Sequence, residues 1–129
     1  MPLMKFNVYA GRSKEQVKRF LDVAHNTTVQ SFGVPDRDRY QIITQHDPEH
    51  FIAQDTGLAI PRSKDFVLLE IISRPRTAAM KEAFYANLCR DLLAECGIAA
   101  SDIMVTFVEN TDADWSFGLG RPQFLTGEL

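Results

Sequence analysis

The stretch LMKFNVY at residues 3–9 decides the fold class of this chain, because hydrophobic and polar side chains alternate along it. Met4, Phe6 and Val8 fall on one face, and the lysine, asparagine and tyrosine fall on the other. Such an alternation is typical of a β-strand that packs one face against a core. The elements that follow this strand determine what covers its hydrophobic face.

A helix is predicted directly after the strand. Ser13 and Gln16 have the spacing of a capping box, and hydrophobic residues then recur at helical spacing. Gly33 predicts the end of the helix, because glycine readily takes the left-handed conformation found there. Residues 40–46 predict a second strand, so the first part of the chain is expected to form a β-α-β unit.

The second part of the chain repeats this plan. Residues 66–72 form a nearly continuous hydrophobic run, which is typical of a strand covered on both faces. Thr77 opens a second predicted helix and Gly97 closes it, and both follow their counterparts Ser13 and Gly33 at the same offset. Residues 103–108 predict the last strand. The nearly constant offset indicates two β-α-β units of equal length.

We expect a single α+β domain over residues 1–129, with an internal repeat at 2–46 and 66–109. Tandem β-α-β units with pseudo-twofold symmetry predict a four-stranded mixed sheet with two helices on one face. No third helix is available for the other face, so we expect a symmetric oligomer to bury it.

Two segments lie outside the repeat. The connection at 47–64 carries turn signals, and a short strand is predicted at 51–53. The segment after Asn110 mixes aromatic residues with glycine and is too hydrophobic for a disordered tail. It is expected to fold back over a sheet edge or onto a neighbouring subunit.

Composition argues against nucleic acid and membranes as partners. The net charge is −3, and no run of basic residues is longer than a pair. No hydrophobic stretch approaches the roughly 20 residues that cross a bilayer, and the first residues lack the core of a signal peptide. Cys89 and Cys96 lie about 10 Å apart along one predicted helix, beyond disulfide reach. Reduced thiols indicate a cytoplasmic protein.

Pro2 is the first candidate for chemistry. Removal of Met1 would leave a free secondary amine at the start of a strand, with a reference pKa near about 8. Such an amine can act as a base, an acid or an iminium-forming nucleophile. Many proteins begin Met-Pro, so the alternative is a proline that only starts the strand.

Arg74 and Arg76 flank Pro75 where the third predicted strand ends, so their side chains are expected to project to the same side. Two guanidinium groups at one place form a receptor for a carboxylate. The alternative is a solvated basic pair that caps the strand.

Two other polar segments are weaker candidates. The alternating charges at 36–39 lead into the second predicted strand and are typical of a solvated turn with mutual ion pairing. His46 and His50 do not predict a metal site, because the intervening proline disfavours the helix that would bring them together.

Several short segments match a known pattern in order along essentially the whole chain. They are Pro2 after Met1, 37–41, 45–46, 55–58, 72–76, 109–110, 112–118 and 124–127. Together they resemble the malonate semialdehyde decarboxylases, a family of amino-terminal proline enzymes in the tautomerase superfamily. The resemblance implies the tautomerase/MIF-like fold, assembly as a homotrimer, and no metal or other cofactor. Ala59 stands where a glycine is expected, and Leu119 replaces an expected basic residue. Both departures are expected to reshape the substrate pocket.

The resemblance also assigns site residues. Pro2 is implied as the catalytic amine, Arg74 and Arg76 as the ligands of a small carboxylate substrate, and Asp38 as the group that assists the amine or a water. A hydrophobic wall, partly from across the subunit boundary, is implied for Trp115, Phe117, Phe124 and Leu129.

The implied reaction is cofactor-independent decarboxylation of malonate semialdehyde (3-oxopropanoate) to acetaldehyde and carbon dioxide. A protonated Pro2 would stabilise the charge that develops on the carbonyl oxygen, and a neutral Pro2 would form an iminium; the sequence leaves both routes open. Asp38 favours the protonated amine and the two arginines disfavour it. The alternative function is therefore a tautomerase or hydratase acting on a 2-oxo or unsaturated acid, and a third is a non-catalytic binding protein.

Overall fold

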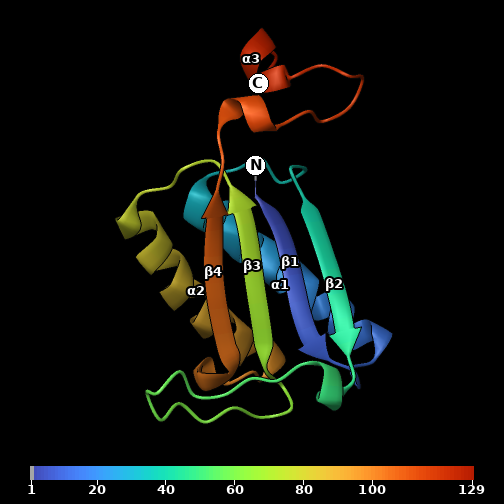
Figure 1. The fold of residues 1–129 in the computed structure, drawn as a ribbon, viewed down its shortest axis with the longest axis vertical. Helices are drawn as coiled ribbons and strands as arrows, with labels where there is room; N and C mark the ends of the chain where they lie inside the picture. Colours follow the sequence, from blue (N-terminus) through green and yellow to red (C-terminus); the bar gives the residue numbers. More distant parts are fainter. Residues whose placement is uncertain (1) are drawn as a thin grey trace.

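The computed structural model describes residues 2–129 and contains one four-stranded mixed sheet with two long helices (Figure 1). The strand order is β2-β1-β3-β4, in which β1 is parallel to β2 and antiparallel to β3, and β3 is parallel to β4. In chain order the main elements are β1 (Leu3–Tyr9), α1 (Lys14–Phe32), β2 (Tyr40–His46), β3 (Val67–Ser73), α2 (Ala78–Cys96) and β4 (Ile103–Glu109). The predicted fold class is confirmed.

The two β-α-β units have elements of equal length. β3 and α2 follow β1 and α1 at one constant offset, and β4 follows β2 at an offset shorter by a single position. The bounds of β1 and β2 are as predicted, whereas β3 begins and ends one position later than predicted and β4 runs on to Glu109. The two units therefore correspond element by element, with a shift of one position before β4.

The helix ends form as the sequence predicts. The Ser13 hydroxyl accepts a hydrogen bond from the Gln16 amide at 3.1 Å, and the Gln16 side chain accepts one from the Ser13 amide at 2.8 Å. The Thr77 hydroxyl caps α2 in the same way. Gly33 and Gly97 close the helices at φ 65° and 68°, a backbone conformation that costs other residues about 1 kcal/mol or more.

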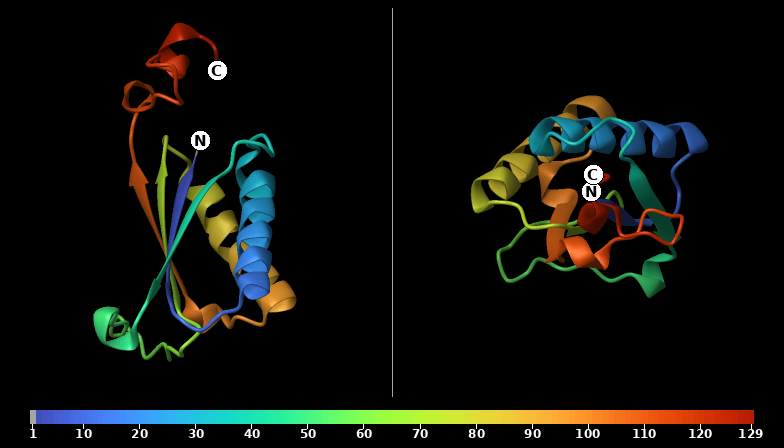
Figure 2. Two further views of the ribbon diagram at one scale, coloured as in Figure 1. Left: turned by 90° about the vertical axis from the view of Figure 1, so that its right-hand side faces the viewer. Right: turned by 90° about the horizontal axis from the view of Figure 1, so that it is seen from above.

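Both helices cover the same face of the sheet, and the hydrophobic core lies between the two layers (Figure 2). Phe20 of α1 meets Phe6 of β1 edge-on, with ring centroids 5.1 Å apart. Phe84 of α2 stacks on Phe32 at the end of α1, at 4.9 Å. Each of these rings is buried, so both helices contribute aromatic residues to the core.

The opposite face of the sheet has no helix over it within residues 2–129 (Figure 2). Lys5 and Glu70 form an ion pair in the middle of this face, with 3.6 Å between Nζ and Oε2. Large hydrophobic side chains of the two outer strands lie around the pair and are between 41% and 49% exposed: Tyr40, Ile42, Met104 and Val108. This is the hydrophobic surface that the predicted oligomer would bury.

The short strand predicted at 51–53 is wrong. The connection between β2 and β3 contains a 3₁₀ turn (Pro48–His50) and then irregular backbone. The Phe51 ring packs 5.0 Å from the ring of Tyr9, and the Tyr9 hydroxyl donates to the Phe51 carbonyl at 2.6 Å. A side chain therefore takes the hydrogen bond that a neighbouring strand would have supplied.

The C-terminal tail, residues 110–129, stands beyond the ends of the strands and does not fold over a sheet edge (Figures 1 and 2). It contains a 3₁₀ turn (Asp112–Asp114) and the short helix α3 (Gln123–Thr126). The Asn110 amide donates to the Ser73 carbonyl at 2.9 Å, so the chain leaves the sheet along the direction of β4. The first expectation for the tail is therefore wrong, and contact with a neighbouring subunit stays a prediction.

Ala59 and Leu119, the two positions that depart from the expected pattern, both have left-handed backbone, with φ values of 57° and 63°. A side chain at such a φ is strained by about 1–2 kcal/mol. The glycine expected at position 59 would relieve that strain.

The two cysteines are free and half-buried, and burial raises the pKa of both thiols. Neither long helix within residues 2–129, nor the short α3, combines the length and hydrophobicity needed to cross a membrane.

Candidate active site

The candidate residues gather at one end of the sheet because of the strand register. β1 and β2 begin at this end, where Leu3 pairs with Tyr40. β3 and β4 finish at the same end, where Ile72 pairs with both Leu3 and Val108. Segments that precede the first two strands and follow the last two must therefore meet here (Figure 1).

Pro2 precedes β1 at this end and is buried. The predicted removal of Met1 concerns a residue that lies outside the described part of the chain. The position of Pro2 beside the ends of β2 and β3 follows from the pairing of Leu3 with both strands.

Arg76 is fixed to the body of the fold. Its Nε donates to the Ser73 hydroxyl at 3.3 Å, and its guanidinium lies 5.1 Å from the centre of the Phe32 ring. Burial lowers the pKa of Arg76, the charge of Arg74 lowers it further, and the charge of Asp38 opposes the shift. Arg74 and Asp38 therefore act electrostatically on Arg76, and the structure brings these three predicted residues together.

Arg74 is fixed to the tail. Its Nε lies 3.3 Å from Oδ1 of Asp112. Its guanidinium lies 4.1 Å from the centre of the Phe124 ring, which is within cation–π distance. Both contacts come from residues 110–129, so Arg74 links the end of β3 to the tail.

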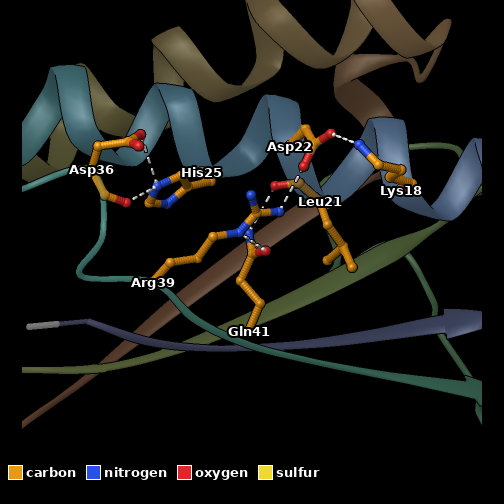
Figure 3. Close-up of polar contacts among 7 residues, drawn as sticks. All are labelled: Lys18, Leu21, Asp22, His25, Asp36, Arg39 and Gln41. Carbon is orange, nitrogen blue, oxygen red and sulfur yellow. Dashed lines mark hydrogen bonds and ion pairs between the residues drawn. The ribbon is translucent and has the colours of Figure 1, made fainter.

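Asp38 sits in the turn between α1 and β2, where its amide donates to the Pro35 carbonyl at 3.0 Å. Its Oδ2 is shielded from solvent. The buried His25 of α1 anchors the same turn, because its Nε2 lies 2.6 Å from the Asp36 carbonyl oxygen (Figure 3). That short contact requires a proton on Nε2, since a carbonyl oxygen can only accept.

The start of β2 is held to α1 by polar contacts on the other side of this turn (Figure 3). Arg39 donates to Asp22 at 2.8 Å, and Gln41 donates to the Leu21 carbonyl at 2.8 Å. Hydrogen bonds from Lys18 and then from Arg39 lower the pKa of Asp22. The ion pairing predicted within 36–39 thus runs, for Arg39, to helix α1.

Three of the four residues predicted for a hydrophobic wall pack together in the tail. Trp115 and Phe117 stack at 5.4 Å, and Phe117 meets Phe124 edge-on at 5.4 Å. Gln123 fixes this arrangement: its side chain accepts from the Phe117 amide at 2.9 Å. Leu129 is 60% exposed, so within one chain it does not join the cluster.

Sequence reasoning missed four supporting residues: Ser73, Asp112, Phe32 and Gln123. Each acts through a contact across a long sequence separation or through a turn, and no local pattern marks it. Ser73 and Asp112 fall inside two of the matching segments, which was the only available signal.

Two hollows in the surface lie away from this site. One of about 520 Å³ is at the opposite end of the sheet and is lined by Arg12, Phe20 and Asp65 among others. The other, of about 360 Å³, lies against α1 and β2. Neither hollow is lined by the predicted catalytic residues, so the candidate site is not part of either. Within residues 2–129 no group of three histidine, cysteine or acidic side chains is placed to hold a metal ion.

Comparison with known proteins decides the family. A family model described as tautomerase enzyme matches residues 38–118, and a second with the same description matches residues 2–70.

The chain belongs to the tautomerase family.

Among similar proteins, the probable tautomerase YrdN of Bacillus subtilis (strain 168) is 50% identical over 129 residues and is covered completely, as is this chain. A crystal structure of malonate semialdehyde decarboxylase, described as a basis for decarboxylase and hydratase activities, superposes with a TM-score of 0.96 at 50% identity and 98% coverage of both chains. A fused 4-OT described as a symmetric trimer matches with a TM-score of 0.75 at 19% identity, covering 92% of this chain and 94% of its own. That last match speaks to the tautomerase fold alone.

Proposed function

We propose that this tautomerase-family protein decarboxylates malonate semialdehyde to acetaldehyde and carbon dioxide. The observation that carries the proposal is the electrostatic cluster of Arg76, Arg74 and Asp38 at the sheet end where Pro2 precedes β1. The 50% identity to a malonate semialdehyde decarboxylase over nearly the full length supports it.

In the proposed reaction the arginines bind the substrate carboxylate and Pro2 faces the aldehyde oxygen. The bond between the carboxylate carbon and C2 breaks, and its electron pair flows toward the carbonyl. A protonated Pro2 stabilises the developing enolate, and C2 then takes a proton to give acetaldehyde. In the alternative route a neutral Pro2 condenses with the aldehyde, releases water and forms an iminium that accepts the same electron pair. C2 of the resulting enamine then takes a proton, and water hydrolyses the product iminium to acetaldehyde and free Pro2.

Ion pairing of the carboxylate stabilises the substrate more than the transition state, because carbon dioxide leaves as a neutral molecule and the negative charge moves from the carboxylate to the carbonyl oxygen. The arginines therefore contribute by orienting the breaking bond out of the carbonyl plane. Their contacts suit this task, since each guanidinium is held both at Nε and against a phenylalanine ring.

Hydration or tautomerisation of a 2-oxo or unsaturated acid is the second candidate function. The similar decarboxylase is described with a hydratase activity as well, and the similar Bacillus subtilis protein is named a probable tautomerase. An amine beside two guanidinium groups supports both chemistries, and its protonation state selects between them.

Assembly as a homotrimer is part of the proposal. The exposed hydrophobic side chains around the ion pair of Lys5 and Glu70 need a cover. A symmetric trimer is described for a protein of this fold. Because the exposed Leu129 belongs to the tail at the site end, a neighbouring chain would complete the hydrophobic wall. The free thiols of Cys89 and Cys96 support a cytoplasmic location.

The test begins with intact mass spectrometry, because a retained Met1 would make the Pro2 nitrogen an amide without basicity. Carbon dioxide release from 3-oxopropanoate is then measured for the wild type and for Pro2→Ala and Arg76→Ala. We expect each variant to lose about 100-fold in kcat/KM, within the range for acid–base groups and for charged hydrogen bonds to substrate.

Arg12→Ala is the matched control, because Arg12 follows β1 at the same spacing as Arg76 follows β3 and lies at the opposite end of the sheet. It should retain wild-type carbon dioxide release. Unchanged release in both Pro2→Ala and Arg76→Ala would contradict the proposal. Absence of release from 3-oxopropanoate, together with turnover of phenylpyruvate or an acetylenic acid, would favour the second candidate.

An NMR titration of ¹⁵N-labelled Pro2 measures the pKa of its amine and so distinguishes a general acid from a general base at this position. A pKa near or above neutrality supports Pro2 as the proton donor. A pKa well below neutrality would exclude the donor role.

A further inference from the structure

The two arginines of the site are supported by the same pair of contacts. In each, Nε meets an oxygen acceptor and the guanidinium lies over a phenylalanine ring. Within residues 2–129 the terminal nitrogens of Arg74 and Arg76 make no side-chain hydrogen bond. Each guanidinium is therefore held from one edge and one face, and its two terminal nitrogens remain for a ligand.

The supports differ in rigidity. Arg76 rests on Ser73 and Phe32, which are 1% and 6% exposed and belong to the body of the fold. Arg74 rests on Asp112 and Phe124, which belong to the tail, and the Asp112 side chain is 54% exposed. The position of Arg74 thus depends on where the tail stands.

We propose that Asp112 is a positioning residue for Arg74, so that the C-terminal tail sets the affinity of the site for a substrate carboxylate. This rests on the proposed function, in which Arg74 and Arg76 bind that carboxylate. Asp112 occupies Nε and so directs the end of the guanidinium, with its two terminal nitrogens, toward the ligand. Bidentate recognition through that end requires the plane of the group to be fixed.

The contact of the Asp112 carboxylate oxygen with Nε of Arg74, rather than the charge of Asp112, is the main effect expected. A carboxylate this exposed interacts weakly through its charge, because water and salt screen it. Its acceptor oxygen still sets the rotation of Arg74 about its last bonds. An asparagine at this position keeps an acceptor oxygen and loses the charge, whereas an alanine loses both.

The experiment compares Asp112→Ala with Asp112→Asn. For each we would measure KM and kcat with 3-oxopropanoate and the dissociation constant of malonate, a carboxylate probe that needs no turnover. Asp112→Ala should raise the malonate dissociation constant about 10-fold, the effect of one charged polar contact. It should lower kcat/KM for 3-oxopropanoate by a similar factor, because Arg74 both binds the carboxylate and orients the breaking bond. Asp112→Asn should restore values near those of the wild type.

Phe124→Leu is the second variant, because leucine fills similar space without a π face. It should weaken malonate binding by about 2–5-fold, in keeping with an exposed cation–π contact. Glu128→Ala is the matched control: Glu128 pairs with Arg121 within the same tail and does not contact Arg74. It should bind malonate as the wild type does.

Equal or tighter malonate binding by Asp112→Ala would overturn the proposal, because Asp112 would then only compete with the ligand. Equal losses in the alanine and asparagine variants would also overturn it, since charge rather than position would be the cause. Malonate binding reports on the arginines even if 3-oxopropanoate is not the substrate, so a failure of the proposed reaction and a failure of the positioning role give different results.

Discussion

The two ends of the sheet are related by the pseudo-twofold axis, yet they use equivalent residues differently. Asp38 and Asp102 end equivalent turns, in which the aspartate amide donates to Pro35 in one unit and to Ala99 in the other. Arg12 and Arg76 also occupy equivalent places, one after β1 and the other after β3.

At the far end, Asp102 and Arg12 form hydrogen bonds with the segment that connects the two units. Asp102 is 4% exposed, and its carboxylate accepts from the Ser63 amide at 2.6 Å and from the Ser63 hydroxyl at 2.5 Å. Arg12 donates to the Asp65 carbonyl at 2.9 Å.

The site end is built differently, because no segment there joins one unit to the other within residues 2–129. Pro2 precedes β1 at this end, and the tail follows β4. The charge of Asp38 acts on Arg76 at this end, where the described part of the chain has no connecting loop to anchor. The same β-α-β unit therefore places structural polar residues at one end of the sheet and candidate catalytic residues at the other.

The largest expected effect tests whether the two β-α-β units contribute equally to the stability of the fold. Phe20→Ala and Phe84→Ala remove fully buried rings at equivalent places in the two helices. Each should destabilise the fold by about 3–5 kcal/mol, through lost burial and a residual cavity. Chemical denaturation of both variants measures this. If the losses of the two variants differ by more than about 2 kcal/mol, the width of the expected range, one unit dominates the stability of the fold.

The second prediction separates structure from chemistry at the equivalent aspartates. Asp102→Ala should lower the free energy of unfolding by about 2–3 kcal/mol, because it leaves the Ser63 amide and hydroxyl without their acceptor. Asp38→Ala should lower carbon dioxide release by about 100-fold. Thermal melts and activity assays on both variants are required. A large loss of activity in Asp102→Ala with none in Asp38→Ala would contradict the different roles assigned to the two aspartates.

The third prediction concerns backbone strain in the far-end connection. Ala59→Gly removes a side chain from a residue at φ 57°, and it should stabilise the protein by about 0.5–1 kcal/mol after the added flexibility of the unfolded chain is subtracted. Activity should not change. Urea denaturation of the variant checks the gain, and a loss of stability would contradict the strain assigned to Ala59.

The smallest effect lies where the two units meet. Thr27 of α1 and Asp91 of α2 occupy equivalent places, and the Thr27 hydroxyl donates to the Asp91 carboxylate at 2.7 Å between the helices. Burial raises the pKa of Asp91, but hydrogen bonds from Arg90 and Thr27 outweigh it and leave the pKa below its usual value. The ionised group therefore stabilises the fold above its unfolded pKa, near 3.8, and this stabilisation is lost as pH falls through the lower folded pKa.

Thr27→Val should accordingly cost less than about 1 kcal/mol near neutral pH. The difference from the wild type should shrink as pH falls through the depressed pKa of Asp91. Thermal melts across the acid range follow it. A difference that grows in acid would show that Asp91 is not the group involved.

Most of the frame was predictable because its signals are local. Alternation at 3–9, the capping box of Ser13 and Gln16, and the closing Gly33 and Gly97 each depend on neighbours within a few residues. The strand at 51–53 was wrongly predicted because a long-range hydrogen bond from Tyr9 takes the place of a strand partner. The position of the tail was missed for a similar reason, since its packing on Arg74 joins segments that no periodicity connects.

The sequence by itself determined the doubled β-α-β plan and marked Pro2, Asp38, Arg74 and Arg76 as the residues to follow. Helix caps and strand alternation are properties of short stretches, and the constant offset is a property of the linear sequence; none of them needs a distant contact. Only the tertiary structure decided which aspartate is buried against Ser63 and which acts on Arg76, and that Arg74 rests on the tail while Arg76 rests on the core. Those outcomes depend on contacts between distant segments, and such contacts exist only once the chain has packed.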